Sequence, residues 1–322
     1  MPETPRILLH NDATHALAMR LEARFPGADF VECNSNDGLP DMIASYRPAV
    51  VYTVRFGGTS AYPGHALFSE GGPRWVANGG AGTDHFGIWD TERTTVTNAA
   101  GVAADMMAEY VIGGFLHFSL DIPGFQTDKA ARRWQARTVR PLNGTTLLIV
   151  GLGQIGQAIA ARAKAFGMRV IGTRARPVAM DNVDHVGAAS DLRTLLPQAD
   201  FIAVSTPLTD QTRGLIGPAE FRSMKQGAVF ADVSRGGVTD QTALLKALQG
   251  NRLTGAVLDV FETEPLPPES PLWAVENAIM SPHCSSVYDG WEEASFDVFL
   301  DNLARWVAGR ELVNIVDPDR GY

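Results

Sequence analysis

Three ionisable residues follow successive strand-like runs in the second half of the chain: Arg235, Glu264 and His283. An imidazole donates a proton near neutral pH, and a neighbouring carboxylate stabilises its charged form. An arginine polarises a carbonyl oxygen and binds a carboxylate through paired hydrogen bonds. Each residue alone has a structural explanation, as a surface ion pair, a solvated turn or a packed imidazole. Together they predict a site that reduces a ketone, with His283 as the proton donor.

A glycine-rich turn predicts where the hydride for such a reduction comes from. The strand-like run 145–150 leads into Gly-Leu-Gly-Gln-Ile-Gly, and a helical pattern follows over 155–166. The first glycine permits a tight turn, the second lets the backbone approach a pyrophosphate, and the third lets helix and strand pack closely. The helix N-terminus adds free N–H groups. We therefore expect a dinucleotide to be bound by Gly151, Gly153, Gln154, Ile155 and Gly156.

The end of the second strand-like run, 168–173, predicts which dinucleotide is bound. A site that prefers NAD usually has an acid there, which bonds the ribose 2′-hydroxyl. Here Thr173, Arg174 and Arg176 occupy the position, with no acid among them. Two guanidinium groups suit a 2′-phosphate, although both arginines could also be ordinary solvated residues. We predict that NADP(H) is preferred, that NAD(H) is possible, and that these three residues contact the cofactor.

Composition limits the class of protein. The chain has 322 residues, which is enough for two domains, and its formal charge of −9 argues against nucleic acid as a partner. Cys33 and Cys284 are the only cysteines and lie far apart, so neither a disulfide framework nor a metal cluster is expected. No signal peptide or membrane-length apolar run is recognisable, which predicts a cytoplasmic location.

Strand-like runs alternate with helical patterns along the whole chain, which predicts an α/β fold of two doubly wound parallel-sheet domains. The natural ligand site of such a fold is the cleft between the domains, at the carboxyl ends of the strands. Helices are expected over 14–25, 103–120, 241–248 and 291–308. A polar, arginine-rich connection follows residue 120. Trp134 within it could close over the cleft, but we expect it to be packed.

Several motifs together resemble those of the D-isomer-specific 2-hydroxyacid dehydrogenase family, over nearly the whole chain. Upstream, the matching segments are 78–84 and 97–102. The others are Gly151–Gly156, Thr206-Pro-Leu-Thr209, Val233-Ser-Arg-Gly-Gly237, Asp259–Pro265 and Ser281-Pro-His283.

The resemblance implies a role for each site residue. Arg235 would bind and polarise a 2-oxo acid, Glu264 would support the imidazole, and His283 would be the general acid and base. Asp259 would anchor the nicotinamide carboxamide, and Thr206 and Pro207 would belong to the cofactor site. The loop with Gly79 and Gly80 would offer backbone N–H groups to the substrate carboxylate.

The resemblance also implies the domain organisation. A flavodoxin-like substrate-binding domain would comprise residues 1–98 and be completed by 284–322. An NAD(P)-binding Rossmann domain would comprise 99–283, and a homodimer would form largely around it. The expected partners are therefore a small 2-oxo or 2-hydroxy acid and a second copy of the chain, with no nucleic acid, membrane or metal.

The activity that fits these features is NADPH-dependent reduction of small 2-oxo acids, of the glyoxylate or hydroxypyruvate type, to D-2-hydroxy acids. Another D-2-hydroxyacid or phosphite dehydrogenase of the same family remains open, as does a cofactor-sensing, corepressor-like binding protein. Arg55 follows a strand-like run and is a candidate for substrate binding, with a structural ion pair as the alternative. Cys284 and Ser285 follow His283; they could tune the pocket, but we expect them to fill space.

Overall fold

The computed structural model describes residues 5–54 and 62–318, and the chain divides into two compact units. Unit 1 comprises Met1–Val102 and Tyr288–Tyr322, and unit 2 comprises Ala103–Val287. The sequence predicts boundaries at 98/99 and 283/284, which differ from the bounds of these units, and the substrate-binding role of unit 1 stays a prediction. Arg55 lies outside the described residues.

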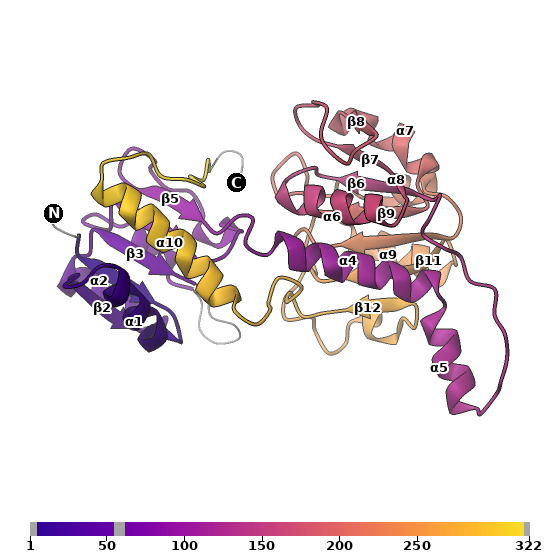
Figure 1. The fold of residues 1–322 in the computed structure, drawn as a ribbon, viewed down its shortest axis with the longest axis horizontal. Coiled ribbons are helices and arrows are strands. Elements are labelled where there is room, and N and C mark those ends of the chain that lie inside the picture. The colour runs from indigo at the N-terminus through magenta and orange to yellow at the C-terminus, as the bar shows by residue number, and fades with distance from the viewer. Residues whose placement is uncertain (1–4, 55–61, 319–322) are drawn as a thin grey trace. The chain divides into compact units, whose positions relative to one another are not determined.

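Unit 1 is built on a five-stranded parallel sheet with the order β2-β1-β3-β4-β5 (Figure 1). This is the strand order of flavodoxin-like folds. Its strands are β1 (Ile7–His10), β2 (Phe30–Cys33), β3 (Val50–Thr53), β4 (Trp75–Asn78) and β5 (Thr95–Asn98). Its helices are α1 (Thr14–Arg24), α2 (Leu39–Tyr46), α3 (Gly64–Leu67) and α10 (Trp291–Val307).

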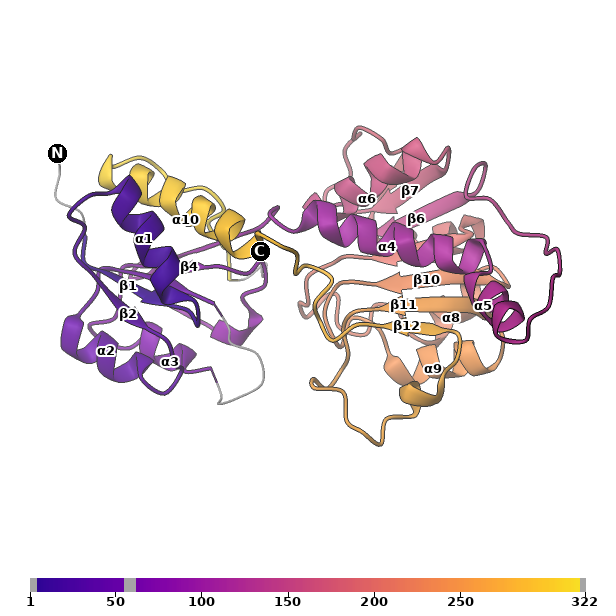
Figure 2. The same cartoon turned by 60° about the horizontal axis from the view of Figure 1, so that its bottom comes forward.

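Both faces of this sheet are covered, which explains why its strands are apolar on both sides. Helices α1 and α10 cover one face and α2 and α3 the other (Figure 2). Along β1, Ile7 and Leu9 belong to the cluster under α1 and α10, and Leu8 belongs to the opposite cluster. Helix α10 thus brings the C-terminal part of the chain into the core of the N-terminal half.

Unit 2 is built on a seven-stranded parallel sheet with the order β12-β11-β10-β9-β6-β7-β8. When the strands are renumbered from β6, this is the Rossmann order, in which the order of strands reverses between β6 and β9. The strands are β6 (Thr146–Val150), β7 (Arg169–Thr173), β8 (His185–Gly187), β9 (Phe201–Val204), β10 (Ala228–Asp232), β11 (Leu253–Leu258) and β12 (Ala278–Met280).

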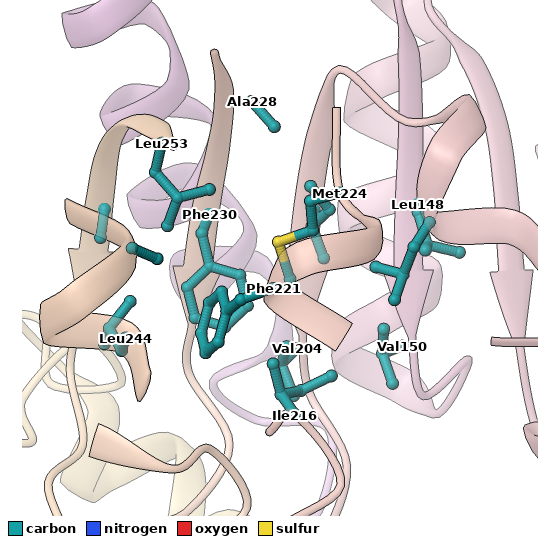
Figure 3. Close-up of a cluster of buried hydrophobic side chains, with 14 of the residues drawn as sticks. Leu148, Val150, Val204, Ile216, Phe221, Met224, Ala228, Phe230, Leu244 and Leu253 are labelled. Atoms are coloured by element: carbon teal, nitrogen blue, oxygen red, sulfur yellow. The ribbon is translucent and has the colours of Figure 1, made fainter. Parts of the chain in front are cut away.

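Helices cover both faces of this sheet as well. Strand residues such as Leu148, Val204 and Phe230 point toward α7, α8 and α9 and form one buried cluster with Phe221 and Leu244 (Figure 3). The alternate strand residues pack against α4 and α6. The bounds are α4 (Ala104–Ser119), α6 (Gln154–Ala165), α7 (Leu192–Leu195), α8 (Pro218–Ser223) and α9 (Gln241–Gln249).

The arginine-rich connection is not simply a loop, because it begins with a helix, α5 (Ile122–Ala130). Figure 1 shows α5 and the segment after it extending away from the rest of unit 2. The expectation that Trp134 is packed is wrong, since its side chain is fully exposed at 105%. In the described part of the chain, no helix combines the length and apolarity needed to cross a membrane.

Candidate active site

The glycine turn between β6 and α6 has the geometry that a pyrophosphate requires. Gly151 has φ +101°, and a Cβ on Gly156 would lie 2.2 Å from the Gly151 carbonyl oxygen. Only glycine avoids both the strain and the clash. A Cβ on Gly153 would meet no atom within 4 Å, so this glycine faces open space at the start of α6. Gly153 is the N-cap and gives the helix no side-chain cap. The residues present therefore fit a dinucleotide phosphate group.

The end of β7 carries the two predicted arginines. Thr173 is buried, and its carbonyl oxygen accepts the N–H groups of Gly151 and Leu152, both at 3.1 Å, which brings the strand end to the glycine turn. The Arg174 guanidinium contacts the Met180 sulfur at 3.4 Å, and Arg176 is exposed. Among the described residues, neither arginine pairs with a carboxylate. Both positive charges can therefore interact with an anion.

Glu264 and His283 are joined by a short hydrogen bond. The distance from His283 Nδ1 to Glu264 Oε2 is 2.8 Å. Burial of the Glu264 carboxyl opposes ionisation, but the pKa of Glu264 is lowered by the hydrogen bonds from His283 and the Phe261 N–H and by the nearby charge of Arg235. An ionised carboxylate only accepts, so Nδ1 carries the hydrogen. The imidazole is thereby oriented with Nε2 free to serve as the reacting nitrogen.

The loop that carries His283 is held by Asp259, which follows β11 and is only 1% exposed. Asp259 Oδ1 accepts the Ser281 hydroxyl at 2.6 Å and the N–H groups of Cys284 and Ser285 at 2.8 and 3.0 Å. Its Oδ2 accepts the Ser285 hydroxyl at 2.5 Å. His283 itself has φ +51°, a conformation that costs a non-glycine residue about 1–3 kcal/mol and persists only under such constraint.

These contacts change the interpretation of two residues. The expectation that Ser285 merely fills space is wrong, because its hydroxyl and its N–H both bond Asp259. The role implied for Asp259, as an anchor of the nicotinamide carboxamide, stays a prediction. What the structure shows is a carboxylate that accepts four hydrogen bonds from the loop around His283.

Arg235 lies in a tight turn that follows β10. The Val238 N–H donates to the Arg235 carbonyl oxygen at 3.1 Å, and Gly237 has φ +90°. The guanidinium Nη1 donates to the Ser234 carbonyl oxygen at 2.7 Å. Because Arg235 also lowers the pKa of Glu264, its charge lies near the Glu264–His283 pair. The three residues predicted from the sequence are thus brought together by the loops after β10, β11 and β12, which are adjacent strands.

The loop after β9 meets the glycine turn. A Cβ on Gly151 would lie 2.7 Å from Thr206 Cγ2, and the Ser205 hydroxyl donates to the Gly151 carbonyl oxygen at 2.9 Å. Within the described residues, the buried Thr206 hydroxyl has no hydrogen-bond partner. Pro207 comes next, and its carbonyl oxygen accepts the Thr212 hydroxyl at 2.6 Å. Thr206 therefore lies against the glycine turn, and the role of Thr206 and Pro207 in a cofactor site stays a prediction.

The predicted glycines of the substrate loop lie in unit 1, directly after β4. The Gly79 N–H donates to the Thr53 carbonyl oxygen at 2.8 Å, so it is already used within the protein. A Cβ there would lie 2.5 Å from the Tyr52 hydroxyl. This differs from the expectation that Gly79 offers its N–H to a substrate, and it leaves Gly80 as the candidate donor of the pair.

Metal and disulfide chemistry find no support in the described residues. No group of three or more His, Cys, Asp or Glu side chains in that part of the chain is arranged to hold a metal ion. Cys33 and Cys284 are both free, the first buried and the second exposed.

Comparison with known proteins decides the family. Residues 112–285 match the family model described as "D-isomer specific 2-hydroxyacid dehydrogenase, NAD binding domain". The chain belongs to the D-isomer specific 2-hydroxyacid dehydrogenase family. It is an NAD(P)-dependent oxidoreductase of 2-hydroxy acids, and unit 2 contains the NAD-binding domain.

Similar proteins come from several bacteria. Glyoxylate/hydroxypyruvate reductase B of Enterobacter sp. (strain 638) is 30% identical over 325 residues, covering 98% of both chains. The structure of a family member from Xanthobacter autotrophicus Py2, in complex with NADPH and MES, is 29% identical with a TM-score of 0.83, over 99% of this chain and 100% of the other. The NADPH-dependent glyoxylate/hydroxypyruvate reductase of Sinorhizobium meliloti, with NADP and sulfate, is 25% identical with the same TM-score and coverage.

One site residue escaped the sequence reasoning altogether. Asp232 ends β10, is 3% exposed, and accepts hydrogen bonds from Ser234 and Thr239 on either side of Arg235. A signal was available, since an acid at the end of an otherwise apolar run, Ala-Val-Phe-Ala-Asp, must find partners if it is buried.

Proposed function

We propose that this protein reduces small 2-oxo acids to D-2-hydroxy acids with NADPH, and that glyoxylate and hydroxypyruvate are its leading substrates. The observation that carries the proposal is the 2.8 Å hydrogen bond between Glu264 and His283, with Arg235 close by. A cation, a carboxylate and an oriented imidazole are what the reduction of a 2-oxo acid needs. The names of the Enterobacter and Sinorhizobium relatives support the choice of substrates.

Each residue of the trio has one task. Arg235 binds the 2-oxo acid and draws electron density toward its carbonyl oxygen. Bound NADPH supplies the hydride that adds to C2. His283 donates the Nε2 proton to the resulting alkoxide oxygen, and the negative charge of Glu264 stabilises the imidazolium from which that proton leaves. In the reverse direction the neutral imidazole takes the proton from the hydroxy acid.

The preference for NADPH rests on Arg174 and Arg176. Arginine binds phosphate through paired, charge-assisted hydrogen bonds, and no carboxylate within the described residues competes for either side chain. The pyrophosphate of the same cofactor would lie at Gly153 and the N–H groups of Gln154 and Ile155. Thr206 borders this turn and Pro207 follows Thr206, and both are proposed to contact the cofactor. Gly80 is proposed to hold the substrate carboxylate.

A substitution at His283 tests the catalytic assignment. His283→Ala removes the proton donor, and loss of general acid catalysis lowers kcat by about 10²–10⁴-fold. The dissociation constant of NADPH, measured by fluorescence titration, should change by less than about threefold, because His283 lies outside the glycine turn. Glyoxylate and hydroxypyruvate are assayed with NADPH and with NADH. If His283→Ala keeps its turnover, the assignment fails.

We also propose that the protein is a homodimer and that the segment around α5 forms part of the interface. The exposed apolar residues of this segment are Leu120, Phe125, Trp134 and Val139. Apolar side chains gathered on a projecting segment favour contact with a second copy. Phe125→Glu with Trp134→Glu should lower the mass measured by light scattering to that of a monomer. Trp273→Glu, at another exposed tryptophan of unit 2, is the matched control and should leave the mass unchanged.

A further inference from the structure

The buried carboxylate of Asp232 contacts the loop of Arg235 from both ends. Its Oδ1 accepts the Ser234 N–H at 2.9 Å and the Ser234 hydroxyl at 2.5 Å. Its Oδ2 accepts the Thr239 hydroxyl at 2.5 Å. Ser234 comes directly before Arg235, and Thr239 comes directly after the turn that contains it. Asp232 therefore holds Ser234 and Thr239 in place, and Arg235 lies in the loop between them.

A chain of contacts connects Asp232 to the guanidinium itself. The N–H and hydroxyl of Ser234 donate to Asp232. The carbonyl oxygen of Ser234 accepts a hydrogen bond from Arg235 Nη1 at 2.7 Å. The direction of that carbonyl group is set by the bonds on the rest of the residue. A substitution at Asp232 would therefore move Ser234, and the shift of its carbonyl group would change the position of the Arg235 guanidinium.

We propose that Asp232 is a positioning residue for the reaction and that it acts through Ser234 and the loop up to Thr239 to orient Arg235 toward the 2-oxo acid. The inference rests on the proposed function, because it assumes that Arg235 binds substrate. Asp232 does not touch the reacting atoms. Its contribution is expected in the binding of substrate and the rate of its reduction, and not in the binding of NADPH.

The surroundings of Asp232 have opposing effects on the ionisation of its carboxyl group. Burial raises the pKa of this carboxyl, the bonds from Ser234 and Thr239 oppose the rise, and the charge of Asp259, which follows the neighbouring strand β11, adds to it. The side chain also borders a cavity of only about 10 Å³, shared with Arg235 and Thr239. A space of this size holds at most about one water molecule.

Two substitutions separate geometry from charge. Asp232→Ala removes all three bonds, and a misplacement of about 1 Å in a substrate-binding group costs about 100-fold, so kcat/KM for glyoxylate should fall by that order. In Asp232→Asn the amide oxygen still accepts from Ser234 and the NH₂ group can donate to the Thr239 hydroxyl. It should keep kcat/KM within about threefold of the native value, because the hydrogen-bonded geometry survives.

A double-mutant cycle shows whether Asp232 acts through Arg235. In the background of Arg235→Ala, adding Asp232→Ala should lower kcat/KM by less than about twofold, because the group that it orients is already gone. Thr239→Val, which releases one end of the loop with little change of shape, should show a smaller loss with the same dependence on Arg235. It also provides the test if Asp232→Ala does not fold.

Asp200→Ala is the matched control. Asp200 is also a nearly buried aspartate of unit 2 with three donors, but it precedes β9 instead of following a strand. Its loss should lower the melting temperature and leave the KM for glyoxylate unchanged. A native protein that does not turn over any 2-oxo acid would refute the proposed function. If the native protein turns over a 2-oxo acid, two results would refute the positioning role alone. One is that the effects of Asp232→Ala and Arg235→Ala on kcat/KM are additive. The other is that Asp232→Asn lowers kcat/KM as much as Asp232→Ala.

Discussion

The arginines at the end of β7 allow a direct test of cofactor choice. Arg174→Gln and Arg176→Gln keep much of the side-chain length and remove the positive charge. If both guanidinium groups bind the 2′-phosphate, each substitution should weaken NADPH and leave NADH nearly unchanged, because NADH has a hydroxyl group at that position. The structure supports this expectation, since in the described residues neither side chain is tied to a carboxylate.

The size of the effect follows from the kind of bond that is lost. A hydrogen bond to a charged group contributes about 1.5–3 kcal/mol, which corresponds to about 10- to 150-fold in the dissociation constant of NADPH. Arg176 is exposed, so its contribution should lie at the lower end of that range, whereas the partly buried Arg174 should reach higher values. Because both would contact one phosphate, the double variant should lose less than the product of the two single effects.

Arg169→Gln is the control for this experiment. Arg169 is at the opposite end of the same strand, about five residues and therefore roughly 17 Å from Arg174. That separation is about twice the Debye length of roughly 8 Å at physiological salt, so its charge should hardly affect the phosphate. Dissociation constants for both cofactors are measured by fluorescence titration. Equal weakening of NADPH and NADH, or no change in either, would refute the assignment of a 2′-phosphate site.

Further predictions concern the glycine turn, the catalytic carboxylate and the pH dependence of stability. Gly156→Ala should destabilise unit 2 by about 1–3 kcal/mol in denaturant unfolding, because its Cβ would lie 2.2 Å from a backbone oxygen. Gly153→Ala, with open space around the new Cβ, should instead weaken NADPH binding with less than about 1 kcal/mol of destabilisation. Glu264→Gln should lower kcat by about 10- to 100-fold while NADPH binding is kept, as stopped-flow and titration would show. Although Asp200 is largely buried, hydrogen bonds from a backbone N–H and two cations lower its pKa, so the stability it provides is present above about pH 4 and lost as the pH falls further. Asp200→Asn should therefore lower the melting temperature at pH 7, and the difference from the native protein should shrink below about pH 4.

The sequence predicted best those parts of the molecule whose signal is local. The glycine turn combines an apolar run, three glycines at fixed spacing and a helical pattern, and each of these depends only on neighbours along the chain. The trio was recognisable because residues after parallel strands gather at one edge of the sheet. Neither inference required knowledge of which side chains touch. In the structure Glu264 and His283 share a hydrogen bond and the Arg235 charge lies near them, while their catalytic roles stay predictions.

Helix α5 shows why other elements were missed. It contains Pro123 and Gly124, which are poor helix formers in other positions, and its sequence has little amphipathic pattern. Its N-cap, Asp121, accepts the Gly124 N–H at 3.2 Å, and Arg137 from the returning chain pairs with both Asp121 and Asp128. These ion pairs join residues up to sixteen positions apart. Short-range periodicity therefore carries no sign of them.

The orientation of the proposed catalytic groups also depends on contacts between residues far apart in the sequence. Asp232 ends β10 and Asp259 follows the adjacent strand β11. Each accepts hydrogen bonds from a loop that carries one proposed catalytic residue, Arg235 in the first case and His283 in the second. A sequence motif identifies the displayed residue, because its chemistry is distinctive. It does not identify the buried carboxylate, whose partners are fixed only when the strands pair in register. Replacing Arg235 or His283 should therefore remove a group that acts in the reaction. Replacing Asp232 or Asp259 should leave that group present but less well oriented, so that the reaction is slower.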